Sequence, residues 1–319
     1  MTDPMIDPAS LAYFQALALH SGGVVVPTGV SEAEQRRWQV EAAEPLARRH
    51  AVAGVTSHLL SLTLPGQELA VRLYRPEGAD GSVLVYLHGG GWVTGSLATH
   101  DLLCRELAQR SRVTILSVGY RRAPENPHPA AQEDALAVVD WLRQVGPALG
   151  VDPQRLALGG DSAGAHLALG AALRAPGVPL AALLLLYPAL DPTCSADSYT
   201  TLSGVGGGLT RAAMVDYWAA YLGRDVDADT LHDPSAAPVR ADDAALARLP
   251  PCCIVSAAVD PLRDEAEAFA TRLTTLGVAV EAWRADGLMH GFARLVQVSP
   301  AAAAAMDRAA AWLSATLAQ

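Results

Sequence analysis

The sequence contains no run of apolar residues long enough to cross a membrane as a helix. Its longest apolar stretch, residues 178–190, is about 13 residues long and includes two prolines, whereas a spanning helix needs roughly 20 apolar residues. The first eight residues contain neither a basic cluster nor an apolar segment, so no signal peptide is predicted. We therefore expect a cytoplasmic protein that does not insert into a membrane.

Positive charge is also scarce. Lysine and arginine together number 23, aspartate and glutamate number 33, and the formal net charge is therefore −10. A nucleic-acid-binding protein usually presents a basic surface to the phosphates, and docking on anionic lipid needs clustered basic residues. The charge balance therefore argues against both classes, and we expect no nucleic-acid partner. Apolar residues make up 51% of the chain, which is too many for a disordered protein.

Cysteine occurs at only four positions, Cys104, Cys194, Cys252 and Cys253. No pair of them has the spacing of a metal-binding motif, and the last two are adjacent within an apolar run. We interpret all four as reduced, buried thiols, which is typical of a cytoplasmic protein. The sequence therefore predicts no metal site.

Short β-rich runs alternate with helical stretches after about residue 55. The run at 82–87 is apolar almost throughout, as expected of a strand covered on both faces. Alternation of strands and helices favours parallel pairing, so we predict an α/β fold with a mostly parallel sheet flanked by helices. The first strands have no helix between them and should pair antiparallel at one edge. The expected strands cover about 56–63, 69–74, 82–87, 112–118, 155–159, 181–187, 252–257 and 278–283, and the main helices about 98–110, 129–145, 163–174, 262–276 and 300–317.

Two segments do not follow this alternation. Residues 1–55 have a helical pattern, and residues 192–238 combine a glycine cluster, a helical stretch over 210–222 and an Asp-rich turn. We interpret the second segment as an insertion above the sheet that forms a cap together with the first. The predicted organisation is therefore a helical cap segment at 1–55, a core at 56–191, a cap insertion at 192–238 and the rest of the core at 239–319.

The strongest local motif is Gly160-Asp-Ser-Ala-Gly164, which follows a predicted strand and begins a predicted helix. This is the G-x-S-x-G pattern in its strand–turn–helix context, where a tight turn exposes the serine hydroxyl. Residues two before and two after the serine must lack bulk, and both are glycine here. The alternative is an ordinary glycine-rich turn. The context favours Ser162 as a nucleophile whose helix N-terminus stabilises developing negative charge.

A second motif, His88-Gly-Gly-Gly-Trp92, follows the strand at 82–87. Alone it would indicate a flexible loop, and it lacks the lysine and the spacing of a phosphate-binding loop. Its occurrence upstream of the serine motif matches the oxyanion hole of lipases and esterases. We expect the backbone N–H groups of Gly90, Gly91 and Ala163 to bind the oxyanion. Gly89 is a less suitable donor, and we expect His88 to hold the loop.

A serine at neutral pH needs a base, and the base needs a carboxylate to orient it. In this chain order the base follows the acid, which leaves His290, just past the last strand, and His232, in the presumed insertion. We predict His290 as the base. For the acid we favour Asp260, which follows a strand and lies at the sheet edge that carries functional groups. Two alternatives stay open. Asp260 only caps the helix, or the acid is Asp264 or Glu265 one turn later.

The sequence resembles the bacterial hormone-sensitive-lipase-like family of α/β-hydrolase esterases over about residues 55–295. The matching segments are His88–Trp92, Thr99–Asp101, Tyr120–Glu125, Gly160–Gly164, Tyr187–Asp191, Asp260–Glu265 and His290–Phe292. Two small departures are the second arginine after Tyr120 and the pair Ala165-His166. The resemblance implies an eight-stranded sheet with a helical cap and a carboxylesterase with Ser162, Asp260 and His290 as its triad.

Such an enzyme forms an acyl-enzyme on a small-molecule ester and needs no metal or organic cofactor. We expect short- to medium-chain esters as substrates, and we expect the cap and Trp92 to shape the pocket. Two alternatives stay open at this point: an amide or lactone hydrolase on the same triad, and a non-catalytic small-molecule receptor on the same fold. The sequence does not decide the oligomeric state, and a homodimer is possible.

Overall fold

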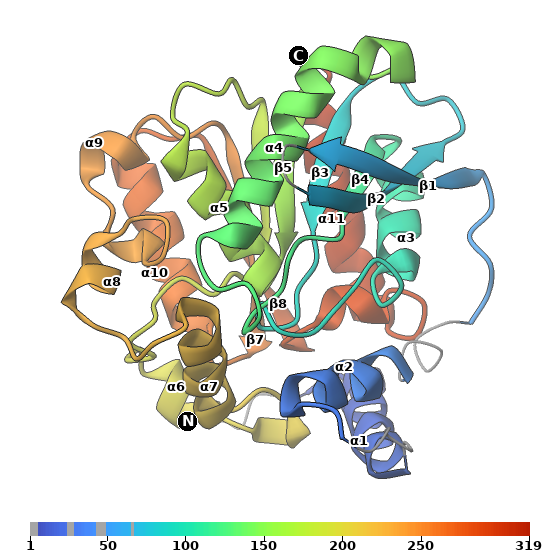
Figure 1. Cartoon of the computed structure of the whole chain (residues 1–319). Coiled ribbons are helices and arrows are strands. Elements are labelled where there is room, and N and C mark those ends of the chain that lie inside the picture. Colours follow the sequence, from blue (N-terminus) through green and yellow to red (C-terminus); the bar gives the residue numbers. More distant parts are fainter. Residues whose placement is uncertain (1–5, 24–28, 43–48, 65–66) are drawn as a thin grey trace.

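The fold is built on one eight-stranded sheet with the strand order β1-β2-β4-β3-β5-β6-β7-β8 (Figure 1). The structure is a computed structural model that describes residues 6–23, 29–42, 49–64 and 67–319. Strands β3 to β8 pair in parallel, whereas β2 is antiparallel to both β1 and β4. The strands are β1 (Val55–Leu64), β2 (Gln67–Pro76), β3 (Val83–Leu87), β4 (Thr114–Val118), β5 (Leu156–Asp161), β6 (Ala182–Leu186), β7 (Cys252–Val259) and β8 (Val280–Met289). The predicted fold class, including the antiparallel edge, is confirmed.

The central strands are apolar throughout because helices cover both faces of the sheet. In β3, the side chains of Val83, Val85 and Leu87 belong to one buried cluster, and those of Leu84 and Tyr86 belong to the other. This alternation follows the two-residue period of a strand. A continuous apolar run therefore fills two cores at once, which explains why the sequence shows no polar face here.

Five long helices form the two outer layers (Figure 1). The cluster on one face contains residues of α4 (Ala130–Val145), α5 (Ala163–Arg174) and α10 (Arg263–Thr275). The cluster on the other face contains residues of α3 (Asp101–Ser111) and α11 (Pro300–Leu317). Helix α11 begins at a capping serine, since Ser299 Oγ accepts the N–H of Ala302 and a proline follows it.

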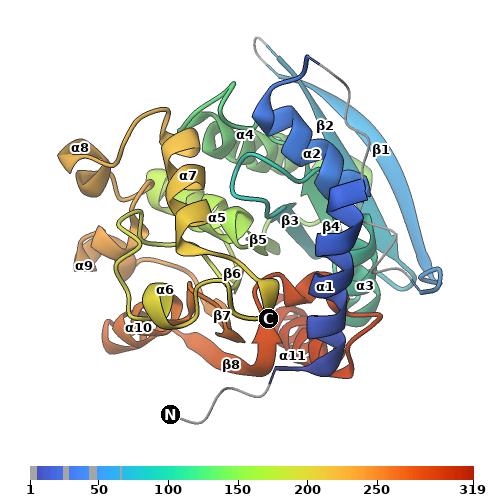
Figure 2. The same ribbon diagram turned by 90° about the horizontal axis from the view of Figure 1, so that it is seen from below.

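Further helices lie near the carboxyl ends of the central strands, which is the side that carries functional groups in such sheets. Figure 2 looks from this side and shows α1 and α2 on one side and α7 on the other. The helices of this region are α1 (Pro8–Gly23), α2 (Glu32–Ala42), α6 (Ser198–Thr201), α7 (Arg211–Leu222) and α8 (Ala228–His232). Helices therefore occur in both segments predicted to form a cap. Residues 1–5, 24–28 and 43–48 of the helical prediction lie outside the described residues.

All four cysteines are buried, and none of them forms a disulfide. Within the described ranges, the structure has no helix that is both long and apolar enough to cross a membrane.

Candidate active site

Ser162 occupies a strained position at the sharp turn between β5 and α5. Its φ angle is +54°, which is unfavourable for any residue with a Cβ. Glycine at positions 160 and 164 allows this tight turn. A Cβ on Gly160 or Gly164 would overlap the carbonyl oxygen of Leu87 on the neighbouring strand. The N–H of Ser162 donates to Leu186 O at 2.8 Å. These contacts fix the backbone and leave the hydroxyl in the lining of a pocket.

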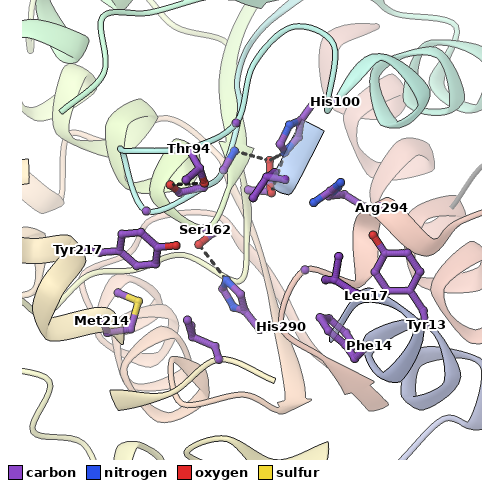
Figure 3. A pocket seen from close by; sticks show the side chains of 18 residues that line it. Tyr13, Phe14, Leu17, Thr94, His100, Ser162, Met214, Tyr217, His290 and Arg294 are labelled. Atoms are coloured by element: carbon purple, nitrogen blue, oxygen red, sulfur yellow. Dashed lines mark hydrogen bonds and ion pairs between the residues drawn. The ribbon is translucent and has the colours of Figure 1, made fainter. Parts of the chain in front are cut away.

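The structure brings Ser162, His290 and Asp260 into one hydrogen-bonded chain. Ser162 Oγ lies 2.9 Å from Nε2 of His290, and Nδ1 of the same ring lies 2.7 Å from Oδ2 of Asp260 (Figure 3). Asp260 follows β7 and is completely buried, and His290 follows β8. The other carboxylate oxygen of Asp260 accepts the N–H of Leu262 at 2.9 Å. The two hydrogen bonds hold this carboxylate against the imidazole.

The alternative base and acids lie elsewhere. His232 is at the end of α8, and its Nδ1 lies 2.6 Å from the carbonyl oxygen of Ala228. Asp264 accepts the N–H of Ser198 at 2.9 Å and pairs with Arg263 at 2.8 Å. Both residues therefore have structural partners and are not hydrogen-bonded to Ser162 or His290.

Glu265 is a buried carboxyl group with a structural role. Its Oε1 accepts the N–H of Leu190 at 2.7 Å, and its Oε2 has no hydrogen-bond partner among the described residues. Burial raises the pKa of Glu265 well above its ordinary value. The folded protein therefore keeps this carboxyl protonated at pH values at which the unfolded chain has lost the proton.

This difference predicts how stability depends on pH. Because the folded state binds the extra proton, Glu265 lowers the free energy of unfolding as pH rises from about 5 toward its folded pKa. The variant Glu265→Gln keeps a neutral side chain of the same shape and removes the titration. We expect the melting temperature of the variant minus that of the wild type to increase between about pH 5 and pH 8. A difference that stays constant over this range contradicts a protonated Glu265.

The glycine loop after β3 lies beside Ser162. Gly90 and Gly91 have φ angles of +123° and +57°, and a Cβ on Gly90 would overlap the backbone of Thr94. No hydrogen bond joins the N–H of either glycine to an acceptor among the described residues. The N–H of Ala163, the first residue of α5, has no acceptor within its own helix. These three N–H groups are the ones predicted for the oxyanion hole.

Asp161 is a functional residue that the sequence reasoning missed. It accepts hydrogen bonds from Tyr86 Oη at 2.7 Å and from the N–H of Gly89 at 2.9 Å, and His100 lies 3.3 Å away. Burial alone would raise the pKa of Asp161, but His100 and these donors hold it below its ordinary value. The carboxylate therefore ties the glycine loop to the serine turn and occupies the N–H of Gly89. An acidic residue directly before the serine was the signal in the sequence.

Trp92 does not lie where it was expected. Its side chain is only 1% exposed, its ring stacks on Tyr221, and its N–H donates to Nδ1 of His166 at 3.1 Å. It is therefore part of the buried core and not a lining residue of the pocket. Burial lowers the pKa of His166 to about 3, so this histidine stays neutral and can accept the indole N–H.

The pocket encloses roughly 780 Å³ of empty space when its open mouth is counted. Its floor is formed by the glycine loop, Ser162 and His290, and Figure 3 shows Ser162 between Tyr217 and His290. Apolar and aromatic side chains from the two segments predicted to form a cap make up most of the walls: Tyr13, Phe14, Leu17, Val40, Leu209, Met214 and Tyr217. Arg294 is the one arginine among the lining residues that the structure describes. No group of three metal-ligating side chains occurs in the described part of the chain.

Comparison with known proteins extends these observations. A family model of the α/β-hydrolase fold matches residues 84–294. The chain is 38% identical over 304 residues to an ethyl acetate hydrolase of Pseudomonas putida, and the aligned region covers 91% of this chain and 92% of that protein. It is 37% identical over 257 residues to the carboxylesterase NlhH of Mycobacterium tuberculosis, covering 78% and 79% of the two chains.

The fold agrees with solved structures as well. A thermostable esterase from Pseudomonas putida superposes with a TM-score of 0.88 at 32% sequence identity, and the match covers 99% of both chains.

Proposed function

This chain belongs to the hormone-sensitive-lipase-like esterases of the α/β-hydrolase fold and is a carboxylic ester hydrolase, and we propose that Ser162, His290 and Asp260 are its catalytic triad. The observation that carries the proposal is the continuous chain of hydrogen bonds from Asp260 through His290 to Ser162. A serine activated by an oriented imidazole is the arrangement that acyl transfer requires.

In the proposed mechanism, Ser162 Oγ attacks the ester carbonyl carbon while Nε2 of His290 takes the hydroxyl proton. The buried Asp260 stabilises the resulting imidazolium. The carbonyl oxygen becomes an oxyanion, which accepts hydrogen bonds from the N–H groups of Gly90, Gly91 and Ala163. His290 then gives its proton to the leaving alcohol, and an acyl-enzyme forms. In the second half, His290 activates a water molecule, and the carboxylic acid is released.

The oxyanion hole is tested by the variant Gly90→Pro, which removes one N–H donor. We expect kcat to fall by about 10²-fold or more, which is the typical effect of losing one oxyanion donor. Proline also conflicts with the positive φ of this position, so the control is Gly78→Pro. Gly78 is exposed, has a φ of +74° and has open space around it. A folded Gly90→Pro protein with the same kcat as this control would remove Gly90 from the oxyanion hole.

We further propose that the acyl chain preferred by the enzyme is short to medium. The apolar side chains of Phe14, Leu17 and Met214 line the same pocket as Ser162, and relatives of this chain are named for acetate esters. The test is kcat/KM for p-nitrophenyl acetate, butyrate, octanoate and palmitate, with an anilide and a lactone added. We expect acetate or butyrate to be fastest. A best rate on palmitate would contradict the short acyl pocket, and a best rate on the anilide or lactone would favour the alternative chemistries.

The division of the chain into core and cap, its cellular location and its partners are also proposals. We assign residues 1–55 and 192–238 to a cap and residues 56–191 and 239–319 to the hydrolase core, because the cap segments supply most of the pocket walls. A cytoplasmic location is supported by the four unpaired, buried thiols. The proposal that the protein has no nucleic-acid partner is based on its net charge of −10. A homodimer stays a prediction.

A further inference from the structure

Arg294 has an unusual environment for a cationic side chain. It belongs to the short helix η5 (Phe292–Leu295), which follows the loop of His290, and its side chain lines the pocket (Figure 3). Its backbone N–H donates to Gly291 O. Its Nη2 atom is buried and has no hydrogen-bond partner among the described residues.

Several other arginines of the protein have carboxylate partners. The pairs Arg37–Glu125, Arg72–Asp101 and Arg121–Asp134 have separations of 2.7, 3.1 and 2.8 Å. A buried guanidinium nitrogen without an acceptor destabilises the folded protein, so the position of Arg294 is not explained by stability. Asp161 also lines the pocket, but Tyr86, Gly89 and His100 already surround its carboxylate.

Tyr13 provides a second unpaired donor in the lining of the same pocket. This residue of α1 is buried, and its hydroxyl has no hydrogen-bond partner among the described residues. Figure 3 shows the hydroxyl of Tyr13 turned toward the guanidinium of Arg294. Buried polar groups are normally satisfied, so two unpaired donors in the lining of one pocket indicate a place where a ligand supplies the acceptors.

We propose that Arg294, assisted by Tyr13, binds a carboxylate group of the substrate, so that esters carrying one free carboxylate are a preferred substrate class. The inference rests on the proposed function of Ser162, since the carboxylate and the scissile ester would share one pocket. A carboxylate offers two oxygens to the fork of a guanidinium and can also accept the phenol O–H. Arg294 is the one arginine that lines this pocket among the described residues and matches a single negative charge, and the net charge of −10 disfavours more highly charged anions.

The test compares each charged ester with its neutral counterpart. Monoethyl succinate against diethyl succinate places the carboxylate in the acyl half, and O-acetyl-lactate against its methyl ester places it in the alcohol half. For Arg294→Met, we expect kcat/KM on at least one charged ester to fall roughly ten- to hundredfold, mainly through KM. We expect the neutral esters to change less than about threefold. The pair that responds identifies the half of the substrate that reaches Arg294.

Two control variants distinguish a loss of ligand binding from a general loss of positive charge, and the melting temperature distinguishes it from a loss of stability. Arg248→Met removes the same charge from an exposed position and should leave both classes of ester unchanged. Arg294→Lys should restore part of the loss. A structural arginine would lower the melting temperature when removed, whereas we expect Arg294→Met to melt at the wild-type temperature or above it, because no ion pair is lost. Tyr13→Phe should produce a smaller loss confined to the charged esters.

An equal loss on charged and neutral esters, or no loss on either, would overturn the proposal. A binding measurement keeps this outcome distinct from failure of the proposed triad. Calorimetry of monoethyl succinate and O-acetyl-lactate with Ser162→Ala should show binding that weakens at least tenfold in Ser162→Ala/Arg294→Met. Turnover that persists in Ser162→Ala, with this binding difference intact, would contradict the triad and leave the carboxylate site standing. Equal binding by both variants would contradict the carboxylate site.

Discussion

Replacing Ser162 by alanine is expected to lower kcat on p-nitrophenyl acetate by about 10⁴-fold or more while leaving the fold intact. The reason is that no acyl-enzyme can form, and only the oxyanion hole and substrate binding would still favour reaction with water. The release of the φ +54° strain at this position is small, since alanine also has a Cβ. The measurement is steady-state kinetics with the melting temperature recorded alongside.

A matched control is Ser117→Ala, which removes the hydroxyl of another buried serine, in β4. We expect this variant to retain kcat within a few-fold of the wild type. A folded Ser162→Ala protein that is no slower than Ser117→Ala would exclude Ser162 as the nucleophile.

The second large effect is expected for Asp260→Asn, with a loss in kcat of about 10⁴-fold. An amide at this position would donate to Nδ1 of His290, which is 2.7 Å away, and would thereby place the ring proton on Nε2. That nitrogen could then no longer accept the proton of Ser162. The neighbouring variant Asp264→Asn has a different expected effect. It removes a charge near the N-terminus of α10, which costs about 0.3–1 kcal/mol of stability, and it leaves kcat nearly unchanged.

Comparing the two variants at one pH decides which carboxylate is the acid. Kinetics and thermal unfolding of both proteins give the ranking directly. A larger loss of kcat in Asp264→Asn than in Asp260→Asn would assign the orienting role to Asp264.

The core of the fold was predictable because its elements carry strong local patterns. The five residues of β3 and of β6 are all buried, and such strands are visible as continuous apolar runs between turns. The edge pairing of β1 and β2 followed from the absence of a helix between them. The lateral order of the strands was not predictable from these patterns, because it depends on which faces of the crossover helices pack together.

The site was predictable only where backbone geometry determines the chemistry. The elbow of Ser162 requires small neighbours, and this requirement appears in the sequence as two glycines. Trp92 follows the glycine loop directly. Its backbone has a φ of +61°, and its side chain packs in the core beside Tyr221. The pocket lining by Arg294 was missed because residues far apart in the chain meet there, and sequence spacing carries no information about such contacts.

The central claim is that Ser162 is an activated nucleophile, and covalent labelling tests it most directly. The full-length protein is treated with an organophosphate, the stoichiometry is measured by intact mass, and the adduct is located by peptide mass spectrometry. We predict one adduct per chain on Ser162, and no adduct in Ser162→Ala, because only a serine activated by a base reacts readily. An adduct on a different serine of the wild-type protein, or a protein that stays unlabelled, would contradict the account.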